Sequence, residues 1–150
     1  MTHMERRLIF KSSPHDVFAR LIDIEAIPEW IPNIKKAHLT SPPPMEVGTT
    51  FVQHTVFMGQ SFQIAGKVAK FDSPAAFGYI YAEGILASVW NYQVTPINSG
   101  SQLLITIEFI EADGLIGLLK RLLRPVSRRM INRNIDNFHA WIERKHAPKP

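Results

Sequence analysis

The longest regular pattern of apolar and polar positions lies in the C-terminal part of the chain. Apolar residues recur there at spacings of three and four, which places them on one face of a helix. They form two stripes: Leu115, Leu118, Leu119, Leu122 and Val126, followed by Ile131, Ile135, Phe138 and Ile142. At about 100° per residue the two stripes do not line up, and Pro125 lies between them. Because a proline in a helix removes a backbone donor, we predict a kink or break near Arg124, between a leading segment at 115–123 and a main helix at 125–145.

The preceding residues show mostly the period of two that is typical of β-strands. The pattern predicts a first strand at 5–11 and then a short helix that begins at Pro14, with Ser13 as its N-cap. A second short helix is predicted to start at Ile24 and to stop before Pro28 or Pro32. Further strands are predicted at 34–39, 49–58, 62–71, 77–82, 86–95 and 102–111.

Tight turns between most of these strands impose antiparallel pairing. Helices gathered on one side of an antiparallel sheet make an α+β domain. We therefore predict one domain over residues 1–150, in which a curved antiparallel sheet wraps around the long C-terminal helix and encloses an apolar cavity. The two short helices follow the first strand.

The composition is that of one globular domain. The chain has 150 residues, of which 45% are hydrophobic and 20% charged, enough to bury a core. It contains no cysteine, which excludes disulfides and thiolate chemistry and fits a reducing compartment. Residues 1–7 lack the apolar run of a signal peptide, and no apolar stretch is long enough to span a bilayer. We expect a cytoplasmic protein, with Met4 as an alternative to Met1 as the natural start.

Basic residues concentrate in the predicted C-terminal helix. Residues 115–150 contain nine lysines and arginines and two acidic residues, a net charge of +7, whereas the preceding residues carry −3. The ordinary explanation is a solvated helix face. The alternative is peripheral contact with an anionic membrane or an acidic partner. Nucleic acid is not expected, because no aromatic residue is interleaved with the arginines. The sequence leaves a homodimer open and identifies no patch for it.

Several short motifs, spread over nearly the whole chain, resemble those of one protein family. They are Ser13-Pro14-His15-Asp16-Val17-Phe18 with Leu21 and Asp23, then Ile27-Pro28-Glu29-Trp30-Ile31-Pro32, then Val47-Gly48-Thr49 before a strand and Asp72-Ser73-Pro74 after one. Together with the long closing helix they resemble the polyketide cyclase/dehydrase-like proteins of the START-like (SRPBCC), helix-grip superfamily. That superfamily also holds birch-pollen-type allergens, abscisic acid receptors and coenzyme Q-binding proteins.

The resemblance implies a helix-grip fold with a cavity between sheet and helix. It also implies that members bind or transform hydrophobic molecules in this cavity. It carries no universal catalytic signature, and a fold shared by many functions cannot decide among them.

The candidate ligand-binding residues combine an apolar body with a polar group, which suits an apolar site that orients its ligand. Tyr79 and Tyr81 share one face of a predicted strand, as do Trp90 and Tyr92, because side chains alternate along a strand. The alternative for these tyrosines and tryptophans is an ordinary core position, and Trp30 would then anchor one end of the sheet. For Asn134 the alternative is an exposed or hydrogen-bonded position. The candidates are Trp30, His54, Tyr79, Tyr81, Trp90, Tyr92, Ile131, Asn134 and Phe138.

His54 and Glu108 are the candidate catalytic residues. Each lies in the middle of a predicted strand, and if both pointed inward they would form an acid/base pair in the cavity. The alternative for His54 is a position at the sheet surface or a hydrogen-bonded one in the core. No metal is expected, since the histidines show no ligand spacing. No cofactor is expected, since Gly114 and Gly117 lack the lysine or third glycine of a phosphate loop.

Three functions are compatible with this sequence. The first is a container that binds, or also transports, a small hydrophobic or amphipathic molecule such as a lipid, quinone or polyketide-like compound. The second is a cyclase or dehydrase that acts on an aromatic or polyketide substrate in the same cavity. The third is an interaction module whose interior is filled by its own side chains and whose basic helix docks on a membrane or a protein.

Overall fold

The computed structural model describes residues 3–82, 84 and 86–146, with the backbone alone for Lys145 and His146. Met1, Glu83 and Lys149 lie outside the described residues. Seven strands form one antiparallel sheet in the order β1-β7-β6-β5-β4-β3-β2. The strands are β1 (His3–Phe10), β2 (Ile34–Leu39), β3 (Thr50–Phe57), β4 (Gln60–Asp72), β5 (Ala76–Tyr81), β6 (Ser88–Ile97) and β7 (Gly100–Phe109).

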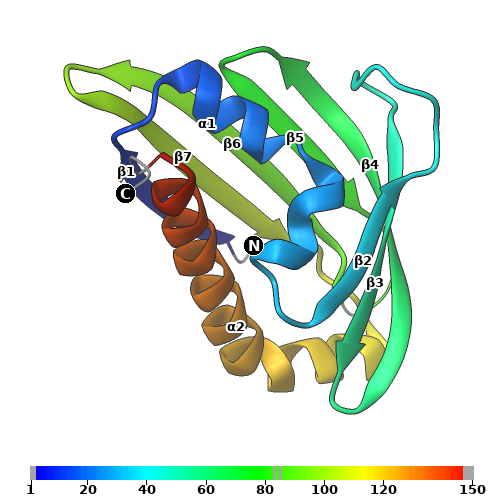
Figure 1. The fold of residues 1–150 in the computed structure, drawn as a ribbon. Helices are drawn as coiled ribbons and strands as arrows, with labels where there is room; N and C mark the ends of the chain where they lie inside the picture. Colours follow the sequence, from blue (N-terminus) through cyan, green and yellow to red (C-terminus); the bar gives the residue numbers. More distant parts are fainter. Residues whose placement is uncertain (1–2, 83, 85, 147–150) are drawn as a thin grey trace.

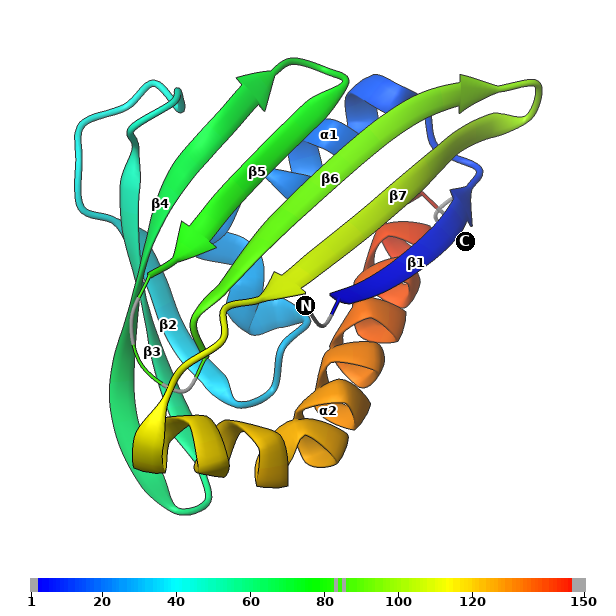
Figure 2. The same ribbon diagram turned by 180° about the vertical axis from the view of Figure 1, so that it is seen from behind.

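The helices all lie on the concave side of the curved sheet (Figures 1 and 2). α1 (Pro14–Leu21) and the 3₁₀ helix η1 (Ile24–Glu29) follow β1 and cover one end of the sheet. The long helix α2 (Gly114–His146) closes the open side. Ser13 caps α1 as predicted, because its Oγ accepts a hydrogen bond from the backbone N–H of Asp16 at 3.2 Å. This is the predicted α+β helix-grip architecture.

Alternation along the strands separates the core side of the sheet from its outer side. On β3, Phe51 and Gln53 are buried, whereas their neighbours Val52 and His54 are half-buried. Gly66 of β4 makes room for Phe51, since a Cβ at position 66 would lie 2.3 Å from Phe51 Cζ. A glycine is therefore required where this fully buried ring lies against the neighbouring strand.

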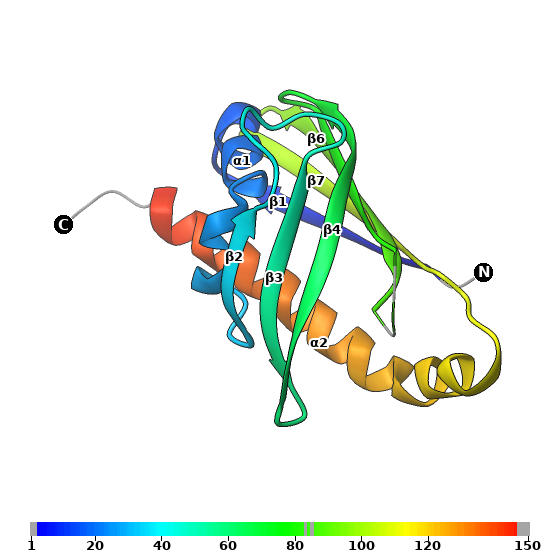
Figure 3. The same ribbon diagram turned by 90° about the vertical axis from the view of Figure 1, so that its right-hand side faces the viewer.

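The sheet opens between β4 and β5. These two strands pair only over residues 67–72 and 76–80, although β4 begins at Gln60. Residues 60–66 of β4 pair with β3 but have no partner on the β5 side among the described residues. The lower part of the β3–β4 hairpin consequently diverges from the rest of the sheet (Figure 3).

Helix α2 is one continuous helix that contains Pro125. The predicted break at Arg124 is therefore wrong, but the helix axis does change direction in its first half, as the kink predicts (Figures 1 and 3). We call residues 114–126 the leading half of α2 and residues 127–146 its closing half. None of the helices that the structure describes is long and apolar enough to cross a membrane.

The two apolar stripes of α2 have opposite environments. In the closing half, Ile135 and Phe138 are buried, with exposed fractions of 4% and 2%. In the leading half, the exposed fraction is 71% for Leu115 and 65% for Leu122. The leading half instead turns Leu123 toward the interior, and its leucine stripe faces solvent.

The closing half of α2 is attached to the edge strand β1. Arg6 Nη1 donates to Asn132 Oδ1 at 2.9 Å, and Arg6 Nη2 donates to Asp136 Oδ1 at 2.8 Å. His139 Nε2 lies 2.8 Å from the backbone oxygen of Ile9. These contacts hold the helix against one edge of the sheet, so the remaining space lies between the helix and the middle strands.

Candidate functional site

A cavity of about 140 Å³ lies between the concave side of the sheet and α2. Its volume is close to the roughly 150 Å³ of a protein cavity that holds one benzene molecule. Most of its wall is apolar, and all the helices and the strands β2 to β7 contribute. Apolar side chains in the wall include Leu21, Ile27, Ile31, Phe57, Ile64, Ile105, Phe109, Leu123, Met130, Ile131, Ile135 and Phe138.

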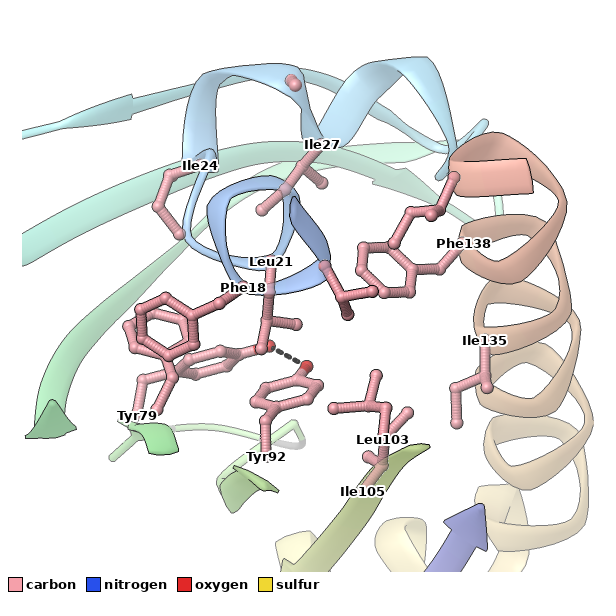
Figure 4. Close-up of a cluster of buried hydrophobic side chains, with 14 of the residues drawn as sticks. Phe18, Leu21, Ile24, Ile27, Tyr79, Tyr92, Leu103, Ile105, Ile135 and Phe138 are labelled. Carbon is pink, nitrogen blue, oxygen red and sulfur yellow. Dashed lines mark hydrogen bonds between the residues drawn. The ribbon is translucent and has the colours of Figure 1, made fainter. Parts of the chain in front are cut away.

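One end of the cavity is closed by a packed cluster (Figure 4). Leu21 of α1 and Ile27 of η1 cover this end from one side, and Ile135 and Phe138 of α2 cover it from another. The Phe138 ring also packs edge-on against Trp30, with 4.8 Å between the ring centroids. This end is a continuation of the hydrophobic core, which fixes the shape of the wall.

Two hydrogen-bonded pairs of side chains lie in the apolar wall. Gln53 Nε2 donates to Tyr81 Oη at 2.9 Å, and the hydroxyls of Tyr79 and Tyr92 lie 2.7 Å apart (Figure 4). In the second pair either hydroxyl can be the donor. One of these two hydroxyls therefore keeps a proton for another acceptor.

Burial is the largest influence on these tyrosines and raises the pKa of all three above the ordinary value. For Tyr79 the charge of Tyr92 adds to this effect, and for Tyr81 the charge of Tyr79 does. The hydroxyls therefore stay protonated at neutral pH and act as hydrogen-bond donors, not as bases.

Two indole groups from opposite sides also line the cavity. Trp90 Nε1 donates to Ser88 Oγ at 3.0 Å, and Ser88 Oγ donates to the backbone oxygen of Leu86 at 2.8 Å. Trp30 Nε1 is buried and has no hydrogen-bond partner among the described residues. An unpaired buried donor is uncommon in folded proteins and favours a bound acceptor.

At the other end of the cavity the wall becomes basic. Lys120 of α2 is buried, and its Nζ donates to the backbone oxygens of Ala87 and Ile110. Burial lowers its pKa, the charge of Arg124 lowers it further, and Glu111 opposes the shift. The Arg124 guanidinium lies over the Phe109 ring at 5.8 Å from the centroid.

A second, more open depression of about 490 Å³ adjoins the cavity where β4 diverges from β5. Phe62, Ile64 and Leu86 line both spaces. These three side chains belong to the walls of both spaces, which therefore adjoin at the gap in the sheet.

The sequence pattern of the family described as "Polyketide cyclase / dehydrase and lipid transport" matches residues 1–143. The chain belongs to this family. The comparison with curated proteins gives no match.

Solved structures with the family's fold are similar over nearly the whole chain. The Zhui aromatase/cyclase from Streptomyces sp. R1128 has a TM-score of 0.78 at 16% identity, with 97% of this chain and 96% of that chain covered. Ara h 8.0201 has a TM-score of 0.71 at 13% identity, with 94% and 97% covered. The di-domain ARO/CYC StfQ from the steffimycin biosynthetic pathway has a TM-score of 0.71 at 16% identity, with 96% and 51% covered. At these identities the likeness establishes the fold.

In this member of the family, His54 and Glu108 do not face the cavity. His54 lies on the outer side of β3, where its ring stacks on His38 at 5.4 Å and its Nδ1 lies 3.4 Å from Gln63 Nε2. Glu108 is exposed on the outer side of β7, whose inward residues are Ile105 and Phe109. The expected inward acid/base pair is therefore corrected, because both residues have the opposite strand parity from the cavity wall.

The other candidate residues all line the cavity: Trp30, Tyr79, Tyr81, Trp90, Tyr92, Ile131, Asn134 and Phe138. Sequence reasoning missed Gln53, Thr55, Asn33, Ser88 and Lys120, which also line it. Gln53 and Thr55 alternate with His54, so they were missed because the face of β3 that carries His54 was taken as the inner one. Lys120 was missed because it stands among arginines, and nothing in the sequence shows that it alone points inward.

The described residues contain no group of three or more histidine, cysteine, aspartate or glutamate side chains able to hold a metal ion. In the cavity wall the described polar groups are amides, hydroxyls, indoles, one amine and one guanidinium. This set consists mainly of hydrogen-bond donors in apolar surroundings, which is suited to an apolar molecule with an oxygen acceptor.

Proposed function

We propose that this protein binds, and can carry, a small hydrophobic molecule with a carbonyl or hydroxyl oxygen in the cavity between the sheet and α2. The apolar wall supplies the affinity, because removing apolar surface from water is the main favourable term in such binding. The family and the fold are consistent with a hydrophobic ligand. The finer claim, an oxygen acceptor, rests on the hydroxyl pair of Tyr79 and Tyr92.

The hydroxyl pair of Tyr79 and Tyr92 is decisive. The two hydroxyls share one hydrogen bond, so whichever of them donates, the other keeps a proton that needs another acceptor. No hydrogen bond of the described residues supplies this acceptor, and both tyrosines line the cavity. A ligand oxygen at this point would satisfy a buried donor that is otherwise unpaired, which favours an oxygen-bearing ligand over a pure hydrocarbon.

Acetophenone and ethylbenzene test this proposal, because they have nearly the same shape and only one has a carbonyl oxygen. The ¹H–¹⁵N NMR titration of the wild-type protein should give tighter binding for acetophenone. Tyr79→Phe/Tyr92→Phe removes both hydroxyls and leaves the rings, so it should weaken acetophenone binding by roughly 5- to 10-fold, the value of one net hydrogen bond. Ethylbenzene binding should change little.

Thr55→Val is the matched control. Thr55 also lines the cavity, but its Oγ1 donates to the backbone oxygen of Asn33 at 3.1 Å and accepts from Asn33 Nδ2 at 3.1 Å. Its hydroxyl is thus engaged, and the variant should keep the preference for acetophenone. Equal affinity of the wild-type protein for the two probes would contradict the role of the Tyr79–Tyr92 pair, and binding of neither would contradict the container.

The second candidate function is a cyclase or dehydrase that acts on an aromatic or polyketide substrate in the same cavity. Lys120 favours it, since burial lowers the pKa of this amine at the cavity wall and so eases the release of its proton. The tyrosines, with raised pKa, would serve as proton donors. Denaturing extraction of the protein from cells, followed by mass spectrometry, would identify a bound molecule. Unchanged mass and absorbance of that molecule on incubation with fresh protein would rule against turnover.

A further inference from the structure

The leading half of α2 exposes a continuous apolar stripe. Leu118 and Val126 have exposed fractions of 45% and 47%. Leu118 lies between the still more exposed Leu115 and Leu122, and Val126 follows Leu122 one turn later. Spacings of three and four residues put these side chains on one face of the helix. Large apolar side chains gathered on one exposed face indicate an interaction surface, whereas single ones do not.

Arginines border this stripe. Arg121, Arg129 and Arg133 are exposed, and Arg128 is half-buried. No acidic residue occurs from residue 114 to residue 135. At about 100° per residue, Arg121 and Arg128 lie together along one side of the leucine stripe, and Arg129 and Arg133 continue it into the closing half. The surface is therefore apolar at its centre and positively charged along one side and at one end.

We propose that the leading half of α2 docks on an anionic membrane surface. A helix with one apolar face and a cationic border lies in the plane of the interface, with leucines among the acyl chains and arginines at the phosphates. A second copy of the chain is less well matched. Pairing this face with itself would bring the two arginine groups together, and the described segment has no carboxylate to compensate them.

The same half of the helix borders the cavity on its other side. Leu123 and Ser127 line the cavity, whereas Leu122 and Val126 face solvent. The turn between β3 and β4, which carries Met58 with an exposed fraction of 75%, lies at the same end of the molecule (Figures 1 and 3). Docking would bring the basic end of the cavity close to the bilayer. The docking itself does not depend on what the cavity holds.

Vesicle co-sedimentation tests the proposal on the full chain. Wild-type protein should bind phosphatidylcholine vesicles that contain phosphatidylserine, and bind pure phosphatidylcholine vesicles much more weakly. The double variant Leu118→Ser/Leu122→Ser should lose roughly tenfold or more of the partition coefficient, because two large apolar side chains no longer leave water. Arg129→Gln/Arg133→Gln should reduce the preference for phosphatidylserine, and added salt should do the same.

Val47→Ser is the matched control. Val47 has an exposed fraction of 60%, but it lies in the loop before β3 at the opposite end of the molecule (Figure 3). Its replacement should leave vesicle binding unchanged. The proposal is overturned if the wild-type protein binds neither kind of vesicle, or if the Leu118→Ser/Leu122→Ser variant binds as well as wild type. It is also overturned if sedimentation velocity reveals a dimer that this variant dissociates while vesicles are not bound.

Discussion

Lys120 differs from the other basic side chains of its segment because it points inward. Its ammonium group donates to the backbone oxygens of Ala87, which precedes β6, and Ile110, which follows β7. One side chain thus joins the leading half of α2 to the ends of two strands. Removing the ammonium charge from water costs free energy, and burial accordingly lowers the pKa of this lysine.

Lys120→Met should lower the free energy of unfolding by about 1–3 kcal/mol, because the two carbonyl oxygens lose a buried donor. Urea unfolding measures this loss, and Lys70→Met, at an exposed position of β4, should change stability by less than about 0.5 kcal/mol.

The same comparison has a defined pH dependence. The folded protein binds the Lys120 proton less tightly than the unfolded chain does, so the wild-type protein gains stability as pH rises toward the ordinary lysine pKa. The advantage of wild type over Lys120→Met should therefore widen with increasing pH. A constant difference would mean that the lysine is not desolvated.

At the scale of elements, the two halves of α2 are held unequally. The closing half has the contacts with β1 through Arg6 and Ile9 and a buried apolar stripe. The leading half has the Lys120 contact and an exposed stripe. Local opening is easiest where few apolar contacts are buried.

Hydrogen exchange should therefore divide α2 into two parts. Backbone amides at 118–124 should exchange faster than those at 133–142, as followed by mass spectrometry of peptides from each part. The closing half is the internal reference. Equal protection in both parts would contradict this unequal attachment, and added anionic vesicles should protect the leading part if it docks there.

The wrong choice of strand face for His54 and the unpredicted exposure of the leucine stripe have the same physical origin. Periodicity states which residues share a face of a helix or a strand, but not what that face meets. In β3, Phe51, Gln53 and Thr55 alternate with Val52, His54 and Val56, and the two sets are about equally apolar. Nothing local therefore distinguishes the inner set. The leucine stripe of α2 likewise predicts a helix but not its exposure, because exposure depends on where the sheet ends.

At the scale of the molecule, the fold follows from the sequence because its determinants are local. Turn residues between alternating segments impose antiparallel hairpins, and one long helix is needed to cover the concave side. The cavity is different. It is the space that remains when side chains from distant elements fail to meet, and a pattern of apolar positions is the same whether that space is filled or empty.

Two isoleucines of α2 make this distinction measurable. Ile131 lines the cavity, whereas Ile142 has an exposed fraction of 2% and packs in the core away from it. Ile142→Phe should lower the free energy of unfolding by about 1–3 kcal/mol through overpacking. Ile131→Phe should cost much less, because the larger ring enters free space, and it should compete with acetophenone. Urea unfolding and NMR titration measure both, and equal destabilisation by the two variants would contradict an open cavity.

Two of the three tryptophans line the cavity, and the third, Trp141, stacks on Trp30 with 6.5 Å between ring centroids. Indole emission responds to the polarity and contacts of its surroundings. The intrinsic fluorescence of the unlabelled protein is consequently a direct signal of cavity occupancy. Candidate molecules can be screened by this signal alone, without a radiolabel, a dye or an enzymatic assay.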